Sequence, residues 1–277
     1  MKIRKKKLFI SMTGIVFVLL LSAWVRHRFA TRFEYVVPGP HDFRVVTWNV
    51  GYFAPVSDKN LRDVDLESVA ELLSGLSADV VVLQELGQVG QAGQIADLLG
   101  EGWNVYEEET GHGNQVMAIL SPREFRSAES FECGGRTTLG VSLYAGNHRP
   151  VYVVGVHSPH PARGIEENAE NIRCALAHAA SKTEDVRIIT GDLNYNFDPG
   201  SEGEFYSEIM QTFGDGTLAL GETYYARTRI DHMFHFPKEL KVVEKGSGMV
   251  DLPVRFAKVP GFRDHRPLVV TYNLDSF

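Results

Sequence analysis

Short apolar runs, rich in β-branched residues, constrain the fold of this chain more than any other feature. The runs are six to nine residues long, and at least two are apolar on both faces, which is typical of strands buried inside a layered protein. They are FRVVTWNV (43–50), ADVVVLQEL (78–86), PVYVVGVHS (150–158), DVRIIT (185–190) and RPLVVTYNL (266–274). Shorter strand-like segments surround them, namely WNVYEE, NQVMAIL, TLGVSLYA, RIDHMFHF and LKVVEKGS.

Single helices are predicted between these strands. Residues 61–76 place Val69 and Leu73 on one apolar helical face, and residues 164–181 form a helix with an acidic first turn, as the helix dipole prefers. Strands that dominate, with single helices between them, predict an α/β fold of two sheets packed face to face with helices outside. No internal repeat or long linker divides residues 43–277, so we expect one domain.

The charge of the chain is unevenly distributed. The formal net charge is −7, but residues 1–32 contain eight Lys or Arg and no acidic residue. The remainder therefore has 28 − 8 = 20 basic and 35 acidic side chains, a net charge of −15. An acidic body repels polyanions, which disfavours non-specific nucleic-acid binding, although bound metal ions would offset that repulsion locally.

The N-terminus predicts a membrane anchor. Residues 8–25 are uncharged and would span about 27 Å as a helix, close to the apolar thickness of a bilayer. A cleaved signal peptide is the alternative, but it usually has a shorter apolar core and a clearer cleavage site. We therefore expect a cytoplasmic basic tail (1–7), a single-pass anchor (8–25), a linker (26–42) and a folded domain (43–277) in the periplasm or outside the cell.

Two cysteines, Cys133 and Cys174, are present. An oxidising compartment permits a disulfide between them, but the sequence is equally compatible with two buried free thiols.

Polar side chains lie near one end of almost every predicted buried strand. They are Asn49, Glu85, His157, Asp192, Asn194, Asp231, Asp264 and His265. If those strand ends converge, four carboxylates and two imidazoles form one cluster, which would repel itself unless a cation neutralised it. Oxygen-rich ligands without a thiolate suit Mg²⁺ or Mn²⁺ better than zinc.

Several of these residues also have a structural interpretation. Asparagine is favoured in turns, so turn capping is one interpretation of Asn49 and Asn194. Glu85 is compatible with a solvated strand end, and a single histidine such as His157 is more often structural than catalytic. Asp231 is harder to explain by a structural role alone, because a charge inside an apolar strand needs a partner, and His265 would be that partner. Together, the residues indicate a functional site.

Seven segments of the chain resemble the endonuclease/exonuclease/phosphatase superfamily, in the order and at the spacing usual for that family. They are TWNVGYF, VVLQEL, NQVMAIL, VVGVHSPHP, ITGDLNYNFD, RIDHMF and FRDHRPLVV. The resemblance implies a four-layered α/β sandwich of two packed, mostly antiparallel sheets flanked by helices. It also implies that the catalytic groups lie on loops at one edge of both sheets.

The resemblance also implies roles for residues that bind metal or activate water. Glu85 resembles the metal-binding glutamate, with Asn49 beside it and Asp264 as a further metal contact. Asp192 resembles the residue that orients or deprotonates the attacking water. Asn194 resembles a donor to a phosphate oxygen.

Histidines complete the implied site. Asp231 resembles the carboxylate that fixes the ring of His265, which would bind or protonate a phosphate oxygen. His157 matches the second histidine of the deoxyribonuclease and sphingomyelinase branches.

We therefore expect a membrane-tethered, divalent-metal-dependent phosphoesterase that hydrolyses a phosphodiester or phosphomonoester by in-line attack of water. The expected substrate is a phospholipid head group, a small phosphodiester or a nucleic acid, and the N-terminal helix makes the membrane a partner. A DNA endonuclease, a non-catalytic membrane-anchored binding module of the same fold, and a structural docking protein are the alternatives. The sequence does not indicate an oligomeric state.

Overall fold

A computed structural model describes residues 32–51, 59–111, 115–146, 148–197, 203–218, 220, 228–252 and 265–277, without the side chains of residues 59–65 and 163. The predicted tail (1–7) and membrane span (8–25) lie outside these residues, as does Asp264. Within the described ranges, none of the helices is both long and apolar enough to cross a bilayer.

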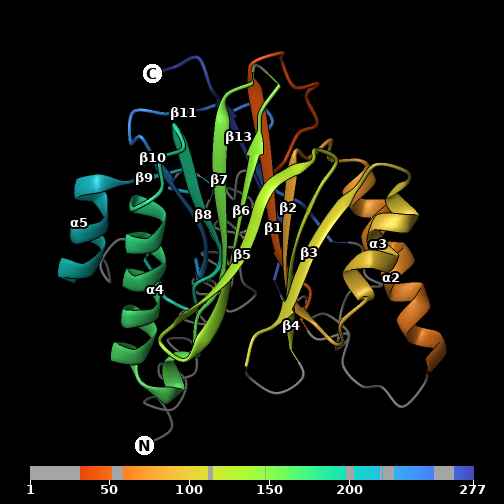
Figure 1. The fold of residues 1–277 in the computed structure, drawn as a ribbon, viewed down its shortest axis with the longest axis horizontal. Helices are drawn as coiled ribbons and strands as arrows, with labels where there is room; N and C mark the ends of the chain where they lie inside the picture. The colour runs from red at the N-terminus through yellow and green to blue at the C-terminus, as the bar shows by residue number, and fades with distance from the viewer. Residues whose placement is uncertain are drawn as a thin grey trace, which may run out of the picture.

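The first of two sheets carries helices α2 (Lys59–Ser74) and α3 (Gln91–Leu99) on its outer face (Figure 1). β12 (Gly248–Met249) also pairs with β13 in this sheet. The order of the other strands is β11 (Lys241–Val242), β13 (Leu268–Asn273), β1 (Asp42–Asn49), β2 (Val80–Leu86), β4 (Val116–Ser121) and β3 (Asn104–Glu109).

The second sheet carries α4 (Ile165–Ala180) and α5 (Gly203–Thr212) on its outer face, on the side of the molecule away from α2 and α3 (Figure 1). A short 3₁₀ helix, η1 (Pro161–Arg163), precedes α4. The strand order is β5 (Phe125–Cys133), β6 (Arg136–Tyr144), β7 (Pro150–His157), β8 (Val186–Asp192), β10 (Asp231–Phe236) and β9 (Gly214–Asp215).

The predicted α/β architecture of two packed sheets with outer helices is confirmed. Strand β5 was not predicted from the sequence. Its sequence, FRSAESFEC, contains mostly exposed polar residues and few apolar ones, as an edge strand allows. The predicted strand LKVVEKGS is wrong for most of its length, since only β11 and a turn form there.

The main core lies between the two sheets. Val82 and Met117 of the first sheet and Val153 and Ile188 of the second are fully buried in it. Gly155 allows the sheets to approach closely, because a Cβ atom there would lie 2.8 Å from Cγ1 of Val82. Burying each such aliphatic side chain contributes about 1.5–3 kcal/mol.

Two parallel strand pairs decide where strand ends gather. β1 and β2 are parallel and joined through α2, and β7 and β8 are parallel and joined through α4, whereas the other pairs are antiparallel. A parallel pair with its crossover helix brings both carboxyl ends to the same edge of a sheet. We call the edge where these four strands end, and where β10 and β13 begin, the rim.

Residues 32–37, which we call the N-terminal strap, lie against the domain. The amide of Phe33 donates to the carbonyl of Met249 at 2.9 Å. The guanidinium of Arg44, whose side chain is almost wholly buried, donates to the carbonyl of Val36 at 2.8 Å. A buried cation is costly unless it is hydrogen-bonded, so Arg44 ties the strap to the first sheet.

A disulfide joins Cys133, at the end of β5, to Cys174 on α4. Of the two alternatives left by the sequence, the structure contains the cross-link. It connects an edge strand of the second sheet to the helix that covers that sheet.

His232 is fully buried in β10. Its Nε2 lies 2.7 Å from the carbonyl of Arg229, and its Nδ1 lies 3.2 Å from Oγ1 of Thr217. Burial lowers its pKa to about 4, although Asp215 and Asp231 favour the protonated ring and the Arg229 charge opposes it. The ring is therefore neutral in the folded protein at neutral pH.

We predict that this ring makes the fold sensitive to acid. In the unfolded chain, His232 takes up a proton below the ordinary histidine pKa of about 6.5, whereas the folded ring stays neutral down to about pH 4. The free energy of unfolding therefore falls by about 3 kcal/mol as the pH drops through this window. Urea unfolding between pH 7.5 and 4 measures this loss. The loss should be smaller in His232→Gln, and an identical pH dependence in both proteins would contradict the assignment.

Candidate active site

Asn49 joins the two sheets at the rim. Its Nδ2 donates to Oε1 of Glu85 at 3.2 Å and to Oδ2 of Asp192 at 2.9 Å. Its Oδ1 accepts from the amide of Gly51 at 2.8 Å, which fixes the orientation of the amide group. Asn49 ends β1 and Asp192 ends β8, so one buried side chain connects strands of different sheets.

Asp192 lies at the centre of the cluster and is 1% exposed. Its Oδ1 accepts from the backbone amide of Asn194 at 2.9 Å. Its Oδ2 is near Nδ2 of Asn49 at 2.9 Å and Nδ2 of Asn194 at 3.3 Å. Nε2 of His265 lies 3.6 Å from the same oxygen, and Nε2 of His157 lies 3.8 Å from it. Four side chains therefore turn toward one carboxylate oxygen.

Asp231 orients the ring of His265. Nδ1 of His265 lies 3.0 Å from both carboxylate oxygens of Asp231, and both side chains are buried. Asp231 begins β10 directly opposite Asp192 on β8. With Nδ1 facing Asp231, Nε2 is the ring nitrogen that faces the centre of the site.

His157 ends β7, where the parallel register places it beside Asp192. Its Nε2 lies 3.5 Å from Oε1 of Glu85. Burial lowers the pKa of His157 to about 4, so its ring is neutral at physiological pH. Its buried Nδ1 has no hydrogen-bond partner among the described residues.

Glu85 reaches the site through an irregularity in β2. The pairing of β2 with β4 shifts register between Leu83 and Leu86, and the backbone of Glu85 has a φ of 57°. A positive φ in a residue other than glycine costs of order 1–3 kcal/mol, and such strain is common at functional sites. Asn194, with a φ of 48°, is strained in the same way. Both strained residues direct polar side chains toward Asp192.

Gly191 allows the strand before Asp192 to lie close to β7. Its φ is 147°, and a Cβ atom there would lie 1.9 Å from the carbonyl oxygen of Val156. Glycine is therefore required immediately before Asp192, which explains the GD pair in the sequence.

The cluster suits a divalent cation. One potential ligand atom each from Glu85, His157 and Asp192 lies within 4.8 Å of the others, and the same holds for Asp192, Asp231 and His265. Burial raises the pKa of Asp192, and the nearby His265 opposes that rise. The potential ligand atoms of these two groups are carboxylate oxygens and imidazole nitrogens, because Asn49 turns Nδ2 toward Glu85 and Asp192, and the carboxylate oxygens fit Mg²⁺ or Mn²⁺.

The structure thus brings together seven of the eight sequence-predicted site residues: Asn49, Glu85, His157, Asp192, Asn194, Asp231 and His265. Asp264, the eighth, lies outside the described residues.

Two asparagines of α4 support the site and were not predicted from sequence. Nδ2 of Asn168 donates to the carbonyls of Pro159 and Leu193, both at 2.7 Å, and so connects the segments that follow β7 and β8. Oδ1 of Asn171 accepts from the hydroxyl of Ser158 at 2.7 Å. Both asparagines are fully buried, and an asparagine pair three residues apart on the apolar face of a helix is the sequence signal that identifies them.

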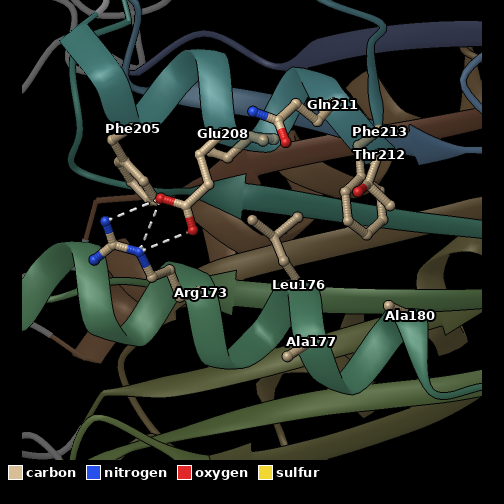
Figure 2. Close-up of a pocket in the computed structure, with 10 residues that line it drawn as sticks. Arg173, Leu176, Ala177, Ala180, Phe205, Glu208, Gln211, Thr212 and Phe213 are labelled. Atoms are coloured by element: carbon tan, nitrogen blue, oxygen red, sulfur yellow. Dashed lines mark hydrogen bonds and ion pairs between the residues drawn. The ribbon is translucent and has the colours of Figure 1, made fainter.

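A groove of about 400 Å³ lies elsewhere, between α4 and α5 on the outer side of the second sheet (Figure 2). Its walls include Leu176, Phe205 and Phe213, and an exposed ion pair of 3.2 Å between Arg173 and Glu208 crosses it. None of the predicted site residues lines this groove.

We predict that Asn168→Ala loosens the rim. The substitution leaves two buried carbonyls without their donor, so the free energy of unfolding should fall by about 1–3 kcal/mol. Hydrogen exchange should also become faster after β7 and β8. Glu170→Ala, at an exposed position of the same helix, is the matched control, and equal stability of the two variants would contradict the supporting role.

Several solved structures share this fold. No curated protein sequence matches this chain. An endonuclease/exonuclease/phosphatase family protein from Leptotrichia buccalis is similar in structure, with a TM-score of 0.66 and 16% identity over 83% of this chain and 99% of that one. D. rerio TDP2 complexed with single-strand DNA product has a TM-score of 0.64 and 16% identity over 84% and 99% of the two chains.

A mannosyl-6-phosphatase from Bacteroides thetaiotaomicron is similar as well, with a TM-score of 0.60 and 16% identity over 82% of this chain and 98% of that one. At these identities the structural matches show a shared fold. The model of the Endonuclease/Exonuclease/phosphatase family matches residues 46–253, a range that contains six of the eight predicted site residues. With this match over most of its length, and with the same two-sheet architecture, the chain belongs to the endonuclease/exonuclease/phosphatase family.

Proposed function

We propose that this protein is a divalent-metal-dependent phosphoesterase that hydrolyses a phosphodiester or phosphomonoester by in-line attack of water. The observation that carries the proposal is the convergence of Asn49, Asn194, His157 and His265 on one oxygen of the buried Asp192. Family membership supports hydrolysis of phosphate esters in general.

Glu85 would hold the divalent cation through its carboxylate, and Mg²⁺ or Mn²⁺ fits such oxygen donors. Asn49 lies beside it and donates from Nδ2 to that carboxylate, so it would have to turn its Oδ1 inward to act as a further ligand. Asp264 is the further candidate ligand from the sequence. A bound cation would neutralise charge on the phosphate and stabilise the leaving oxygen.

Asp192 would accept a proton from the attacking water. Its Oδ1 is held by the amide of Asn194, while Oδ2 faces the other site residues, so the carboxylate has one orientation. General-base assistance of this kind contributes roughly 10²–10⁴-fold in rate. The side-chain amide of Asn194 donates to the carbonyl of Ser158 at 3.0 Å and to Asp192 at 3.3 Å, and it would exchange the second of these bonds for one to a phosphate oxygen.

His265 would donate from Nε2 to a phosphate oxygen as negative charge develops in the transition state. Asp231 holds Nδ1 at 3.0 Å and so directs Nε2 toward the centre of the site. A donor that is oriented in advance costs little reorganisation during the reaction. His157 would provide a second, neutral imidazole near Glu85 and Asp192.

Two classes of substrate compete. The structural neighbours include a protein bound to a DNA product and a sugar phosphatase, so the fold accommodates both kinds of ester. The net charge of −15 outside residues 1–32 favours a lipid head group or small phosphoester over DNA, because an acidic surface repels a polyanion. A DNA endonuclease is the second candidate. A non-catalytic module is disfavoured, since the described part of the site retains every predicted side chain.

We further propose that residues 1–7 remain in the cytoplasm, residues 8–25 span the membrane and residues 26–42 link the span to a catalytic domain, 43–277, outside the cytoplasm. The uncharged N-terminal run supports the anchor. The Cys133–Cys174 disulfide supports an oxidising compartment for the domain.

We predict that Asp192→Asn and His265→Gln each lower the rate of phosphoester hydrolysis by at least about 100-fold without unfolding the protein. The full chain should be tested with Mg²⁺ against plasmid DNA, phospholipids and a chromogenic diester. Asp185→Asn and His41→Gln are matched controls and should retain activity, because these exposed residues precede β8 and β1 at the ends of the strands away from the rim. Unchanged hydrolysis in both site variants would refute the mechanism.

We also predict that EDTA abolishes hydrolysis and that Mg²⁺ or Mn²⁺ restores it. Glu85→Gln should raise the metal concentration needed for half-maximal activity by about tenfold or more, because it removes a charged oxygen ligand. Metal titration of the activity measures this change, with Asp185→Asn as the control. Full activity of the metal-stripped protein would exclude the proposed role of the cation.

A further inference from the structure

The N-terminal strap joins the domain at the rim. Its Phe33 amide binds the carbonyl of Met249, and Met249 pairs with Leu268 at the start of β13. Leu268 follows His265 by three residues and pairs with Thr47, two residues before Asn49. Phe33 therefore lies beside the end of the first sheet that carries the candidate active site.

Close packing holds this entry point in place. A Cβ atom on Gly248 would lie 2.6 Å from the backbone nitrogen of Phe33, so strap and β12 are in direct contact. The side chain of Arg32 forms a 3.3 Å ion pair with Asp251, which follows β12 toward the rim. The bond from Arg44 to the carbonyl of Val36 secures the other end of the strap. The position of Arg32 relative to the rim is thus set by the fold.

The distance from this point to the membrane is short. Only residues 26–31 separate the predicted span, 8–25, from Arg32. Seven steps along a fully extended chain reach about 25 Å at most.

We propose that the docked strap turns the rim toward the bilayer that anchors the chain, so that the substrate is a phosphoester in the head group of a lipid in the same membrane. The proposal rests on the proposed phosphoesterase function and anchor, and narrows the substrate class. A phosphoester dissolved in water reaches the site in any orientation, whereas a lipid head group reaches it only when the rim lies near the membrane surface.

The test compares two substrates of the same chemistry with the full chain reconstituted in vesicles. One is bis(p-nitrophenyl) phosphate in solution, and the other is a lipid with a p-nitrophenyl phosphodiester head group in the same vesicles. A helical spacer of four EAAAK repeats between residues 31 and 32 would raise the rim by about 30 Å. The same spacer between residues 7 and 8, on the other side of the span, is the matched control.

The spacer at 31/32 should lower hydrolysis of the lipid at least tenfold and leave hydrolysis of the soluble ester within twofold, while the spacer at 7/8 changes neither. Equal hydrolysis of both substrates by the 31/32 variant would overturn the orientation and leave the proposed function intact. If the unmodified chain with Mg²⁺ hydrolyses neither these diesters nor p-nitrophenyl phosphate, the proposed function fails instead.

Orientation has a readout that does not depend on activity. Glu166, on the first turn of α4, is near the rim because α4 follows β7, and Thr183 follows the other end of the same helix. Both positions are exposed, and the helical part between them, residues 166–180, spans about 21 Å. Fluorophores on Glu166→Cys and Thr183→Cys should show stronger energy transfer to acceptor lipids from position 166. Equal transfer, or stronger transfer from 183, would refute the proposal.

Discussion

The buried carboxylate of Asp192 is the interaction on which the rest of the rim depends. A carboxylate that is 1% exposed is stable only when hydrogen bonds or opposite charges replace its water. Its partners come from both sheets: Asn49 from β1, His157 from β7, Asn194 from the following loop and His265 from the segment before β13. Satisfying one buried charge therefore requires that four distant parts of the chain meet.

Parallel strand pairs make this meeting possible. Each sheet contains one such pair, and each pair brings two carboxyl ends to the same edge. The antiparallel partners β10 and β13 then begin where the parallel strands end, which adds Asp231 and places His265 near the site. The topology explains why residues 49 to 265 reach one place without a long loop in the described part of the chain.

Outer elements fix the geometry that the sheets provide. Asn168 and Asn171 connect α4 to the segments after β7 and β8, and the disulfide from Cys174 attaches the same helix to β5. On the first sheet, Arg44 and β12 hold the strap against the domain. The asparagines and the disulfide of α4 support the position of the site residues. Arg44 and β12 determine where the strap meets the domain relative to those residues.

The sequence by itself determined the fold class, most strands and helices, and the identity of the residues that meet at the rim. These features follow from local periodicity and from polar residues that end apolar runs, so they are visible without tertiary contacts. Asp231 was identifiable because a charge within an apolar strand requires a partner, and His265 is that partner.

Only the tertiary structure decided how those residues face one another. The strained backbone of Glu85 arises from a register shift against β4, which no local pattern encodes. The pairing of Cys133 with Cys174, the supporting asparagines of α4 and the docking of the strap depend on contacts between residues far apart in sequence. β5 was missed because an edge strand buries little apolar surface, and its pairing with β6 rather than its own composition makes it a strand.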